Sequence, residues 1–203
     1  MTGNEKTESA AKKKIVVCIS GMAGTGKSTL AKKLAERYNL KYYSGGDALK
    51  ELAAAEGYDP SSNGWWESPE GLSFLDKREQ NPKFDKAVDN KLLEYAQQGC
   101  VLLDSWTMPW LLKTGFKIWL IASVEKRVER IAERDKLSIE EALQVLEEKE
   151  RKTKFIYKKL YGFLLGEDLQ PFDLILDTNN LNAGEVFQTL CTVMDNIVLK
   201  NQN

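Results

Sequence analysis

The residues best suited to chemistry form a glycine-rich run at positions 21–28, which reads GMAGTGKS. Its spacing is G-x-x-x-x-G-K-[ST], the pattern of a phosphate-binding loop. Glycines let successive backbone N–H groups turn toward phosphate oxygens, and a lysine and a hydroxyl follow them. The pattern predicts a nucleoside triphosphate site in which Lys27 reaches the β- and γ-phosphates and Ser28 ligates Mg²⁺.

The segments on either side give this run the context that a phosphate-binding loop requires. Residues 15–19 are apolar and mostly β-branched, which predicts a buried parallel strand. Leu30, Leu34 and Tyr38 follow at helical spacing and predict one apolar helix face. In this order the helix N-terminus, with its partial positive charge, lies at the phosphates. A chance glycine turn is the alternative, and the flanking elements argue against it.

A carboxylate ends a second buried strand, predicted at residues 100–104 with the sequence CVLLD. In phosphate-loop proteins an acidic residue after such a strand holds magnesium through its waters or orients the acceptor. Asp104 is therefore predicted to act in catalysis, and Ser28 and Asp104 form the predicted metal site.

The composition excludes several classes of protein. The chain has 203 residues, a length typical of one domain, and no histidine, which excludes Ser-His-Asp and Cys-His hydrolases. A net charge of −1 argues against nucleic-acid and membrane partners, and no apolar run has the length of a membrane span. Three scattered cysteines predict no disulfide or zinc framework and a reducing, cytoplasmic setting.

The rest of the chain alternates predicted strands with predicted helices. Further strands are predicted at 41–44, 116–121 and 172–176, and further helices at about 45–56, 71–79, 82–98, 124–134, 137–161 and 183–199. This alternation predicts an α/β fold with a five-stranded parallel sheet flanked by helices on both faces. Ligands then lie at the carboxyl ends of the strands. We expect residues 1–13 to be a disordered leader ahead of a single domain at 14–203.

Six stretches together resemble the archaeal cytidylate kinase-like family of nucleoside monophosphate kinases. They read ISGMAGTGKST, YYSGGDALKEL, VLLDSW, KIWLIASVEKRVERIAERDKLSIEEAL, KKLYG and FDLILDT. The resemblance runs from residue 14 to residue 199. It implies a P-loop NTPase core with a helical acceptor-binding insertion at about 47–98 and a helical lid at about 134–166. It also implies transfer of the γ-phosphoryl group of Mg-ATP to CMP or dCMP, and we expect a monomer.

The resemblance implies roles for particular residues. Arg130 and Arg134 match helix-borne arginines that close on the transferring phosphate, so we predict both as catalytic together with Lys27 and Asp104. The predicted ATP-binding residues are Gly21, Met22, Ala23, Gly24, Thr25, Gly26, Lys27, Ser28 and Thr29, with Thr178 and Leu181 near the adenine. The predicted acceptor-binding residues are Ser44, Gly45, Asp47, Lys50, Arg78, Asp104, Trp106 and Arg151.

Several of these residues have a second interpretation. The arginines could pair with Glu129 and Glu133 on a solvated helix face. Asp47 could simply cap its helix, and the charge run 147–154 could be a solvated surface. Trp106 could stack on a base or pack in the core.

The chain also departs from the family pattern around the acceptor. Lys50 replaces an arginine that grips the acceptor phosphate, Ser105-Trp106 follows Asp104 in place of Gly-Arg, and Ile156 replaces an arginine near the lid. A kinase for another nucleotide or a small metabolite is therefore one alternative. An ATP-binding regulatory protein with slow ATPase activity is the other.

Overall fold

A parallel sheet forms the centre of the molecule. The structure is a computed structural model that describes residues 14–62 and 64–200, so the predicted leader at 1–13 lies outside the described residues. The five strands are β1 (Val16–Gly21), β2 (Lys41–Ser44), β3 (Val101–Asp104), β4 (Phe116–Ile121) and β5 (Leu174–Asp177). Their order in the sheet is β2-β3-β1-β4-β5, and every pairing is parallel. The predicted five-stranded parallel sheet is therefore confirmed.

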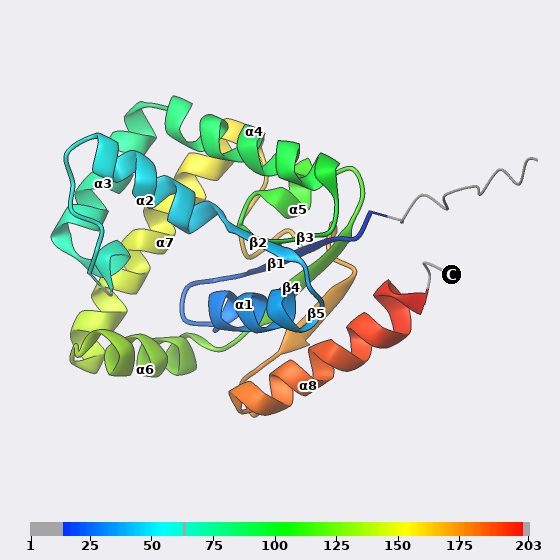
Figure 1. Cartoon of the computed structure of the whole chain (residues 1–203). Coiled ribbons are helices and arrows are strands. Elements are labelled where there is room, and N and C mark those ends of the chain that lie inside the picture. The colour runs from blue at the N-terminus through cyan, green and yellow to red at the C-terminus, as the bar shows by residue number, and fades with distance from the viewer. Residues whose placement is uncertain (1–13, 63, 201–203) are drawn as a thin grey trace, which may run out of the picture.

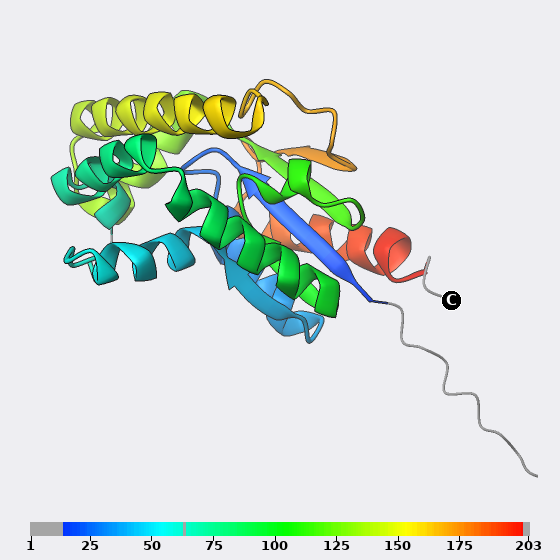
Figure 2. The same ribbon diagram turned by 90° about the horizontal axis from the view of Figure 1, so that it is seen from above.

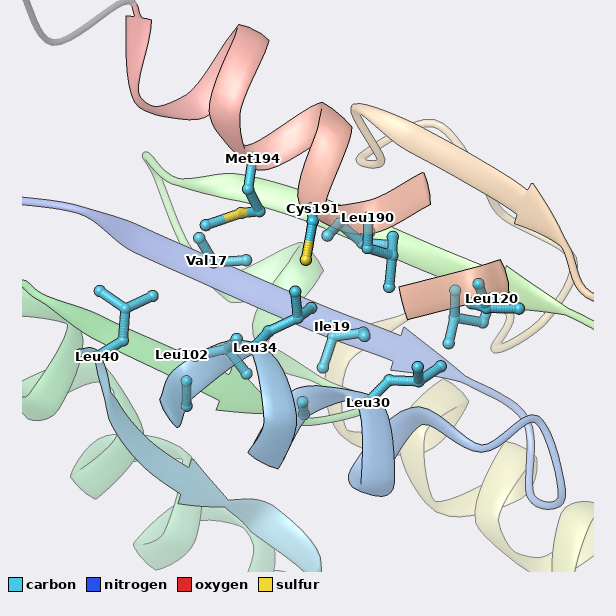
Figure 3. Packing of buried hydrophobic residues seen from close by; sticks show 14 residues of the cluster. Val17, Ile19, Leu30, Leu34, Leu40, Leu102, Leu120, Leu190, Cys191 and Met194 are labelled. Carbon is cyan, nitrogen blue, oxygen red and sulfur yellow. The ribbon is translucent and has the colours of Figure 1, made fainter. Parts of the chain in front are cut away.

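Alternate residues of the central strands face opposite layers of helices, as the period of a strand requires. On one face Val17 and Ile19 pack against α1 (Lys27–Arg37) and α8 (Ala183–Val193). Figure 3 shows this cluster between β1 and the two helices. On the other face Cys18 and Leu103 pack against α2 (Gly45–Ala55), α4 (Lys83–Gln98) and α5 (Met108–Leu111). Figure 1 shows the two layers on either side of the sheet.

Three further helices gather beyond the carboxyl ends of the strands. They are α3 (Pro69–Gln80), α6 (Val124–Asp135) and α7 (Ile139–Tyr161), and the 3₁₀ turn η1 (Trp65–Glu67) precedes them. Figure 2 shows the long helix α7 beside α3, at the end of the molecule toward which β1 runs. Helix α3 falls in the region predicted as acceptor-binding insertion and α7 in the region predicted as lid, whereas α6 reaches the predicted lid only at its last residues.

Some boundaries differ from the sequence prediction. Helix α3 begins at Pro69, because the Ser68 side chain accepts a hydrogen bond from Gly71 N and proline suits a first turn. Residues 108–111, for which the sequence predicts no helix, form the short helix α5. The last helix changes at Met194 into a π-helical segment, η2 (Met194–Val198). No helix in the described ranges combines the length and the apolar character needed to cross a membrane.

The buried face of the sheet gives a test of the fold. Ile118 on β4 is 0 % exposed, whereas Ile175 on the neighbouring edge strand is 44 % exposed. Replacing Ile118 by alanine should lower the free energy of unfolding by about 2–5 kcal/mol, since it leaves a cavity in the core. The matched change at Ile175 should lower it by less than about 1 kcal/mol. Urea unfolding followed by tryptophan fluorescence measures both, and equal losses would contradict this packing.

Candidate active site

The phosphate-binding loop adopts a backbone that depends on glycine. Gly24 and Gly26 have φ values of +81° and +85°, in the left-handed region that glycine occupies readily. A Cβ added at Gly24 would lie 2.7 Å from the carbonyl oxygen of Arg127, so no side chain fits there. Gly26 directly precedes α1, which places the helix N-terminus at the loop.

Side chains from other elements hold the loop from outside. Arg127 donates from Nη1 to the Ala23 carbonyl oxygen at 3.1 Å and also pairs with Glu150 of α7. Trp106 donates from Nε1 to the Gly21 carbonyl oxygen at 2.5 Å. Across a trans peptide the carbonyl and the next N–H point in opposite directions. Binding of the Ala23 carbonyl to Arg127 therefore turns the Gly24 N–H the other way, toward the inside of the loop.

A cavity of about 450 Å³ opens beside this loop, at the carboxyl ends of β2 and β3. Its walls come from the loop, from α2, α3 and α4, and from the lid helices α6 and α7. The predicted residues that line it are Ala23, Gly24, Lys27, Ser28, Thr29, Ser44, Gly45, Asp47, Lys50, Arg78, Asp104, Trp106 and Arg134. The structure therefore brings together most of the predicted loop, acceptor and catalytic residues.

The cavity has a charged centre where Lys27 and Asp104 lie. Burial lowers the pKa of Lys27, and the nearby Asp104 opposes that shift. The Lys27 ammonium lies 5.1 Å from the centroid of the Trp106 ring, a cation–π distance. Asp104 is 4 % exposed and accepts a hydrogen bond on Oδ2 from the Tyr42 hydroxyl at 3.2 Å. Burial, together with Asp104, raises the pKa of Tyr42, which keeps that hydroxyl a donor.

Two further cations line the cavity and share one buried carboxylate, Glu67. Arg134 of α6 lies 3.0 Å from Glu67, and Lys149 of α7 lies 2.5 Å from it. Arg134 also binds its neighbour Asp135 through Nε and Nη2, at 2.7 and 2.6 Å. Glu67 comes from η1, within the predicted acceptor-binding region, and the two cations come from α6 and α7. An anionic ligand in this cavity would therefore meet two cations already held in place.

Sequence reasoning did not predict Glu67. It follows two tryptophans in a segment without a predicted helix or strand, and no spacing connects it with residues 134 and 149. The packing of η1 against α7 brings it to Lys149. Arg134 pairs with Glu67 and Asp135 and not with Glu129 or Glu133, and its side chain is 50 % exposed.

A second polar group lies around Arg78. This arginine is 2 % exposed and binds Asp85 through two bonds, from Nε at 3.2 Å and from Nη2 at 2.6 Å. Burial works to lower its pKa, but Asp85 and Tyr157 raise it above its ordinary value. Asp89, one turn along α4, accepts hydrogen bonds from the Tyr161 hydroxyl at 2.6 Å and from the Thr107 hydroxyl. Burial raises the pKa of Asp89 to about 6.

Several predicted residues lie away from the cavity. Arg130 donates to the Thr178 carbonyl at 3.1 Å, to the Thr178 hydroxyl at 3.3 Å and to the Gly24 carbonyl at 3.4 Å, so it binds the outside of the loop. The prediction that Arg130 closes on the transferring phosphate together with Arg134 is not supported by this position. Thr178 lies beside the loop through this contact, as an ATP-side residue would, whereas Leu181 packs against the core.

The structure corrects the prediction that Arg151 binds the acceptor. It is exposed and does not line the cavity. Lys149 and Thr153 on the same helix do line it, and Arg151 lies halfway between them, about 200° around the helix from each. Ile156, the departure near the lid, is 2 % exposed in an apolar cluster with Leu75 and Trp119.

Two side-chain roles also differ in detail from the expectation. Ser44, not Asp47, caps α2: its hydroxyl accepts a hydrogen bond from Asp47 N at 3.0 Å. The Asp47 side chain is therefore free of the capping role and lies exposed at the cavity. Trp106 supports the loop through Gly21 and packs edge-on against Tyr157, with ring centroids 6.4 Å apart.

A phosphate loop after the central strand, an acidic residue at the end of the adjacent strand β3, and helices that line a cavity beside both define a P-loop protein of the kinase type. The sequence model of the cytidylate kinase-like family matches residues 16–180. The chain belongs to the cytidylate kinase-like family.

Relatives agree with this assignment. A cytidylate kinase of Pyrococcus horikoshii is 33 % identical, over 92 % of this chain and 91 % of its own length. One from Methanocaldococcus jannaschii is 34 % identical, over 90 % of this chain and 99 % of its own. Among solved structures, shikimate kinase from Bacteroides thetaiotaomicron has a TM-score of 0.55 at 13 % identity, covering 89 % of this chain and 96 % of its own. That likeness shows the same fold.

The pKa of Asp89 gives a pH-dependent test of the site. Its folded pKa of about 6 exceeds the ordinary value of 3.8, so between these values the folded protein binds the extra proton. Stability from this group is present below about pH 4 and is lost as the pH rises through 6. Asp89→Asn removes the titrating carboxyl group and with it this pH-dependent loss of stability. The difference in unfolding free energy, variant minus wild type, should rise by about 2–3 kcal/mol between pH 4 and pH 7.

Urea unfolding at several pH values measures this difference. The groups that face Asp89, namely Arg78, Asp85, Thr107 and Tyr161, are present in both proteins. Glu94→Gln, an exposed change on the same helix, is the matched control and should give a difference that does not vary with pH. If the unfolding free energies of Asp89→Asn and wild type change in parallel with pH, the raised pKa of Asp89 is contradicted.

Proposed function

We propose that this protein transfers the γ-phosphoryl group of Mg-ATP to the phosphate of CMP or dCMP. The observation that carries the proposal is one continuous cavity that joins the phosphate loop to a second polar group of residues. Membership of the family, and relatives that bear the name cytidylate kinase, support the choice of acceptor.

The donor side of the cavity suits the triphosphate of ATP. The loop N–H groups, the N-terminus of α1 and Lys27 supply positive charge to the β- and γ-phosphates. Arg130 and Thr178 lie on the outer side of the loop, where the adenosine part of ATP would extend. These positions support an orientation of ATP in which the γ-phosphate lies at the cavity.

Magnesium fits the donor set. In the described part of the chain, no group of three or more Asp, Glu, Cys or His residues is suited to hold a metal ion. Mg²⁺ in nucleotide sites needs only one or two protein ligands, since phosphate oxygens and waters complete the octahedron. Ser28 and Asp104 both line the cavity, and Asp104 has an oxygen that Tyr42 does not engage. When bound, the ion neutralises phosphate charge.

Transfer then depends on position and charge neutralisation. An oxygen of the acceptor phosphate attacks the γ-phosphorus, the bond from that phosphorus to the β-phosphate oxygen breaks, and ADP and a nucleoside diphosphate form. Lys27, Arg134 and Lys149 neutralise the charge that spreads over the migrating group, with Lys50 available to the acceptor phosphate. Asp104 lies at the end of β3, where it can orient the acceptor. A strong base is not required.

The proposal also covers closure of the lid, the oligomeric state and the location in the cell. Helix α7, which spans most of the predicted lid, and Arg134 at the end of α6 form one wall of the cavity. Closure of this lid over both nucleotides would exclude water that hydrolyses ATP. The proposal takes a monomer as the active unit. Nucleoside monophosphates are cytoplasmic metabolites, and we place the protein there.

Lys27 provides the direct test. Lys27→Met keeps the aliphatic stem and removes the charge, so kcat/KM for ADP formation with CMP should fall at least about 100-fold. The circular dichroism spectrum and the melting temperature should stay close to wild type. Lys33→Met is the matched control, because Lys33 is exposed on the same helix and does not line the cavity.

The wild-type protein should be assayed against CMP, dCMP, UMP, dTMP, AMP and GMP, with a reaction lacking acceptor. Strong stimulation by CMP or dCMP is the expected result. Full activity of Lys27→Met would contradict the assignment of the site. Slow ADP release that no acceptor changes would indicate a regulatory ATPase instead.

A further inference from the structure

One buried carboxylate holds two of the cations in the cavity wall. An oxygen of Glu67 lies 2.5 Å from the Lys149 ammonium nitrogen, and the other lies 3.0 Å from Arg134 Nη2. The Glu67 side chain is 4 % exposed, and all three residues line the cavity. Taking a charge out of water is costly unless it is paired, so these groups stabilise one another. An anionic group therefore already engages the two cations before any phosphate enters.

These three charges lie close enough to Lys27 to act on it. Burial is the largest influence on the pKa of Lys27 and lowers it. Among the nearby charges, Asp104 and Glu67 raise that pKa, whereas Lys149 and Arg134 lower it. Electrostatic effects weaken with distance, so Glu67 and its two partners border the place proposed for the γ-phosphate.

The segment that carries Glu67 is held in place by its own packing. Trp65, two residues earlier, is 1 % exposed, and its carbonyl oxygen accepts a hydrogen bond from the Ser68 hydroxyl at 2.7 Å. A Cβ added at Gly71 would lie 2.1 Å from the same oxygen, so the first turn of α3 packs directly on η1. Glu67 therefore projects from a fixed turn, which distinguishes it from a mobile surface carboxylate.

We infer that Glu67 is an internal counter-ion that keeps Arg134 and Lys149 from the γ-phosphate of ATP until an acceptor phosphate is present. It thereby limits hydrolysis, the side reaction in which a water oxygen attacks the γ-phosphorus, the bond to the β-phosphate oxygen breaks, and ADP and inorganic phosphate form. This inference rests on the proposed function.

Charge balance explains why the acceptor and not ATP alone would release the cations. The phosphate loop and Lys27 already supply positive charge to the phosphates of ATP, so separating the cations from Glu67 gains little and leaves a buried carboxylate unpaired. An acceptor phosphate brings about 1.5 to 2 further negative charges beside the γ-phosphate at pH 7. The cations then gain more from the two phosphate groups than from one carboxylate.

Glu67→Gln tests the inference, because the amide keeps the shape of the side chain and removes its charge. At saturating Mg-ATP without acceptor, release of inorganic phosphate should rise at least about 10-fold, since both cations become available to the γ-phosphate. KM for CMP should fall, because no carboxylate competes with the incoming phosphate. Glu67→Asp restores the charge and should return hydrolysis toward the wild-type rate.

Asp76→Asn is the matched control. Asp76 of α3 lies 2.5 Å from Lys152 of α7, and Asp76 does not line the cavity. This variant also removes a carboxylate that pairs with a lysine of α7, but at a distance from the phosphates. It should leave both acceptor-free hydrolysis and KM for CMP close to wild type.

A double variant shows whether the gain passes through a freed cation. Glu67→Gln combined with Lys149→Met should hydrolyse ATP at least about 10-fold more slowly than Glu67→Gln alone. A purely structural role of Glu67 gives a different pattern, in which Glu67→Gln lowers hydrolysis and transfer together and raises KM for CMP. That pattern, or a rate of hydrolysis that Glu67→Gln does not change, overturns the inference.

The failure of this inference can be told from the failure of the proposed function. If wild type transfers phosphate to no nucleotide, the proposed function fails and the inference fails with it. If wild type phosphorylates CMP but hydrolysis is insensitive to Glu67, only the inference fails. Should Glu67→Gln not fold, wild type with cytidine and inorganic phosphite decides, because phosphite supplies the negative charge without the ribose. Phosphite should raise the release of inorganic phosphate from saturating Mg-ATP above that with cytidine alone, and no increase overturns the inference.

Discussion

The rest of the site depends on the conformation of the phosphate loop, which other elements hold from outside. Arg127 binds the Ala23 carbonyl, Trp106 binds the Gly21 carbonyl, and a side chain at Gly24 would collide with the backbone of α6. The loop is thus packed between the central strand, the segment after β3 and α6. Because α6 contacts the loop directly, the conformation of the loop depends on the position of this helix.

Charge balance joins α6 and α7 to η1. Glu67 of η1 is buried and binds both Arg134 at the end of α6 and Lys149 of α7. Without a counter-charge, cations gathered beside Lys27 would repel one another in a partly desolvated cavity. Glu67 supplies that counter-charge, and phosphate groups entering the cavity would offer another. The same contact therefore assembles the cations and connects the three elements that carry them and their counter-charge.

The sequence predicted what depends on local pattern. The glycine spacing, the buried strand before it and the helix after it are contiguous, so the loop and the parallel sheet could be predicted from them. The side-chain roles that failed depend on contacts distant in sequence. Arg130 and Arg134 share a helix face, yet one meets Thr178 and the other Glu67, and helical spacing does not distinguish these partners. Arg151 points away from the cavity, which follows from the rotation of α7 and not from charge. Glu67 has no local signal at all.

The central claim is that the cavity joins a phosphoryl donor to a nucleotide acceptor. The most direct measurement is a ³¹P nuclear magnetic resonance time course of the protein with Mg-ATP and CMP. The account predicts that ADP and CDP appear together in equal amounts, that inorganic phosphate stays near background, and that the reaction runs backward when CDP and ADP are supplied. Inorganic phosphate accumulating with ADP, while CMP remains unchanged, would contradict it, because water and not a bound nucleotide would then be the acceptor.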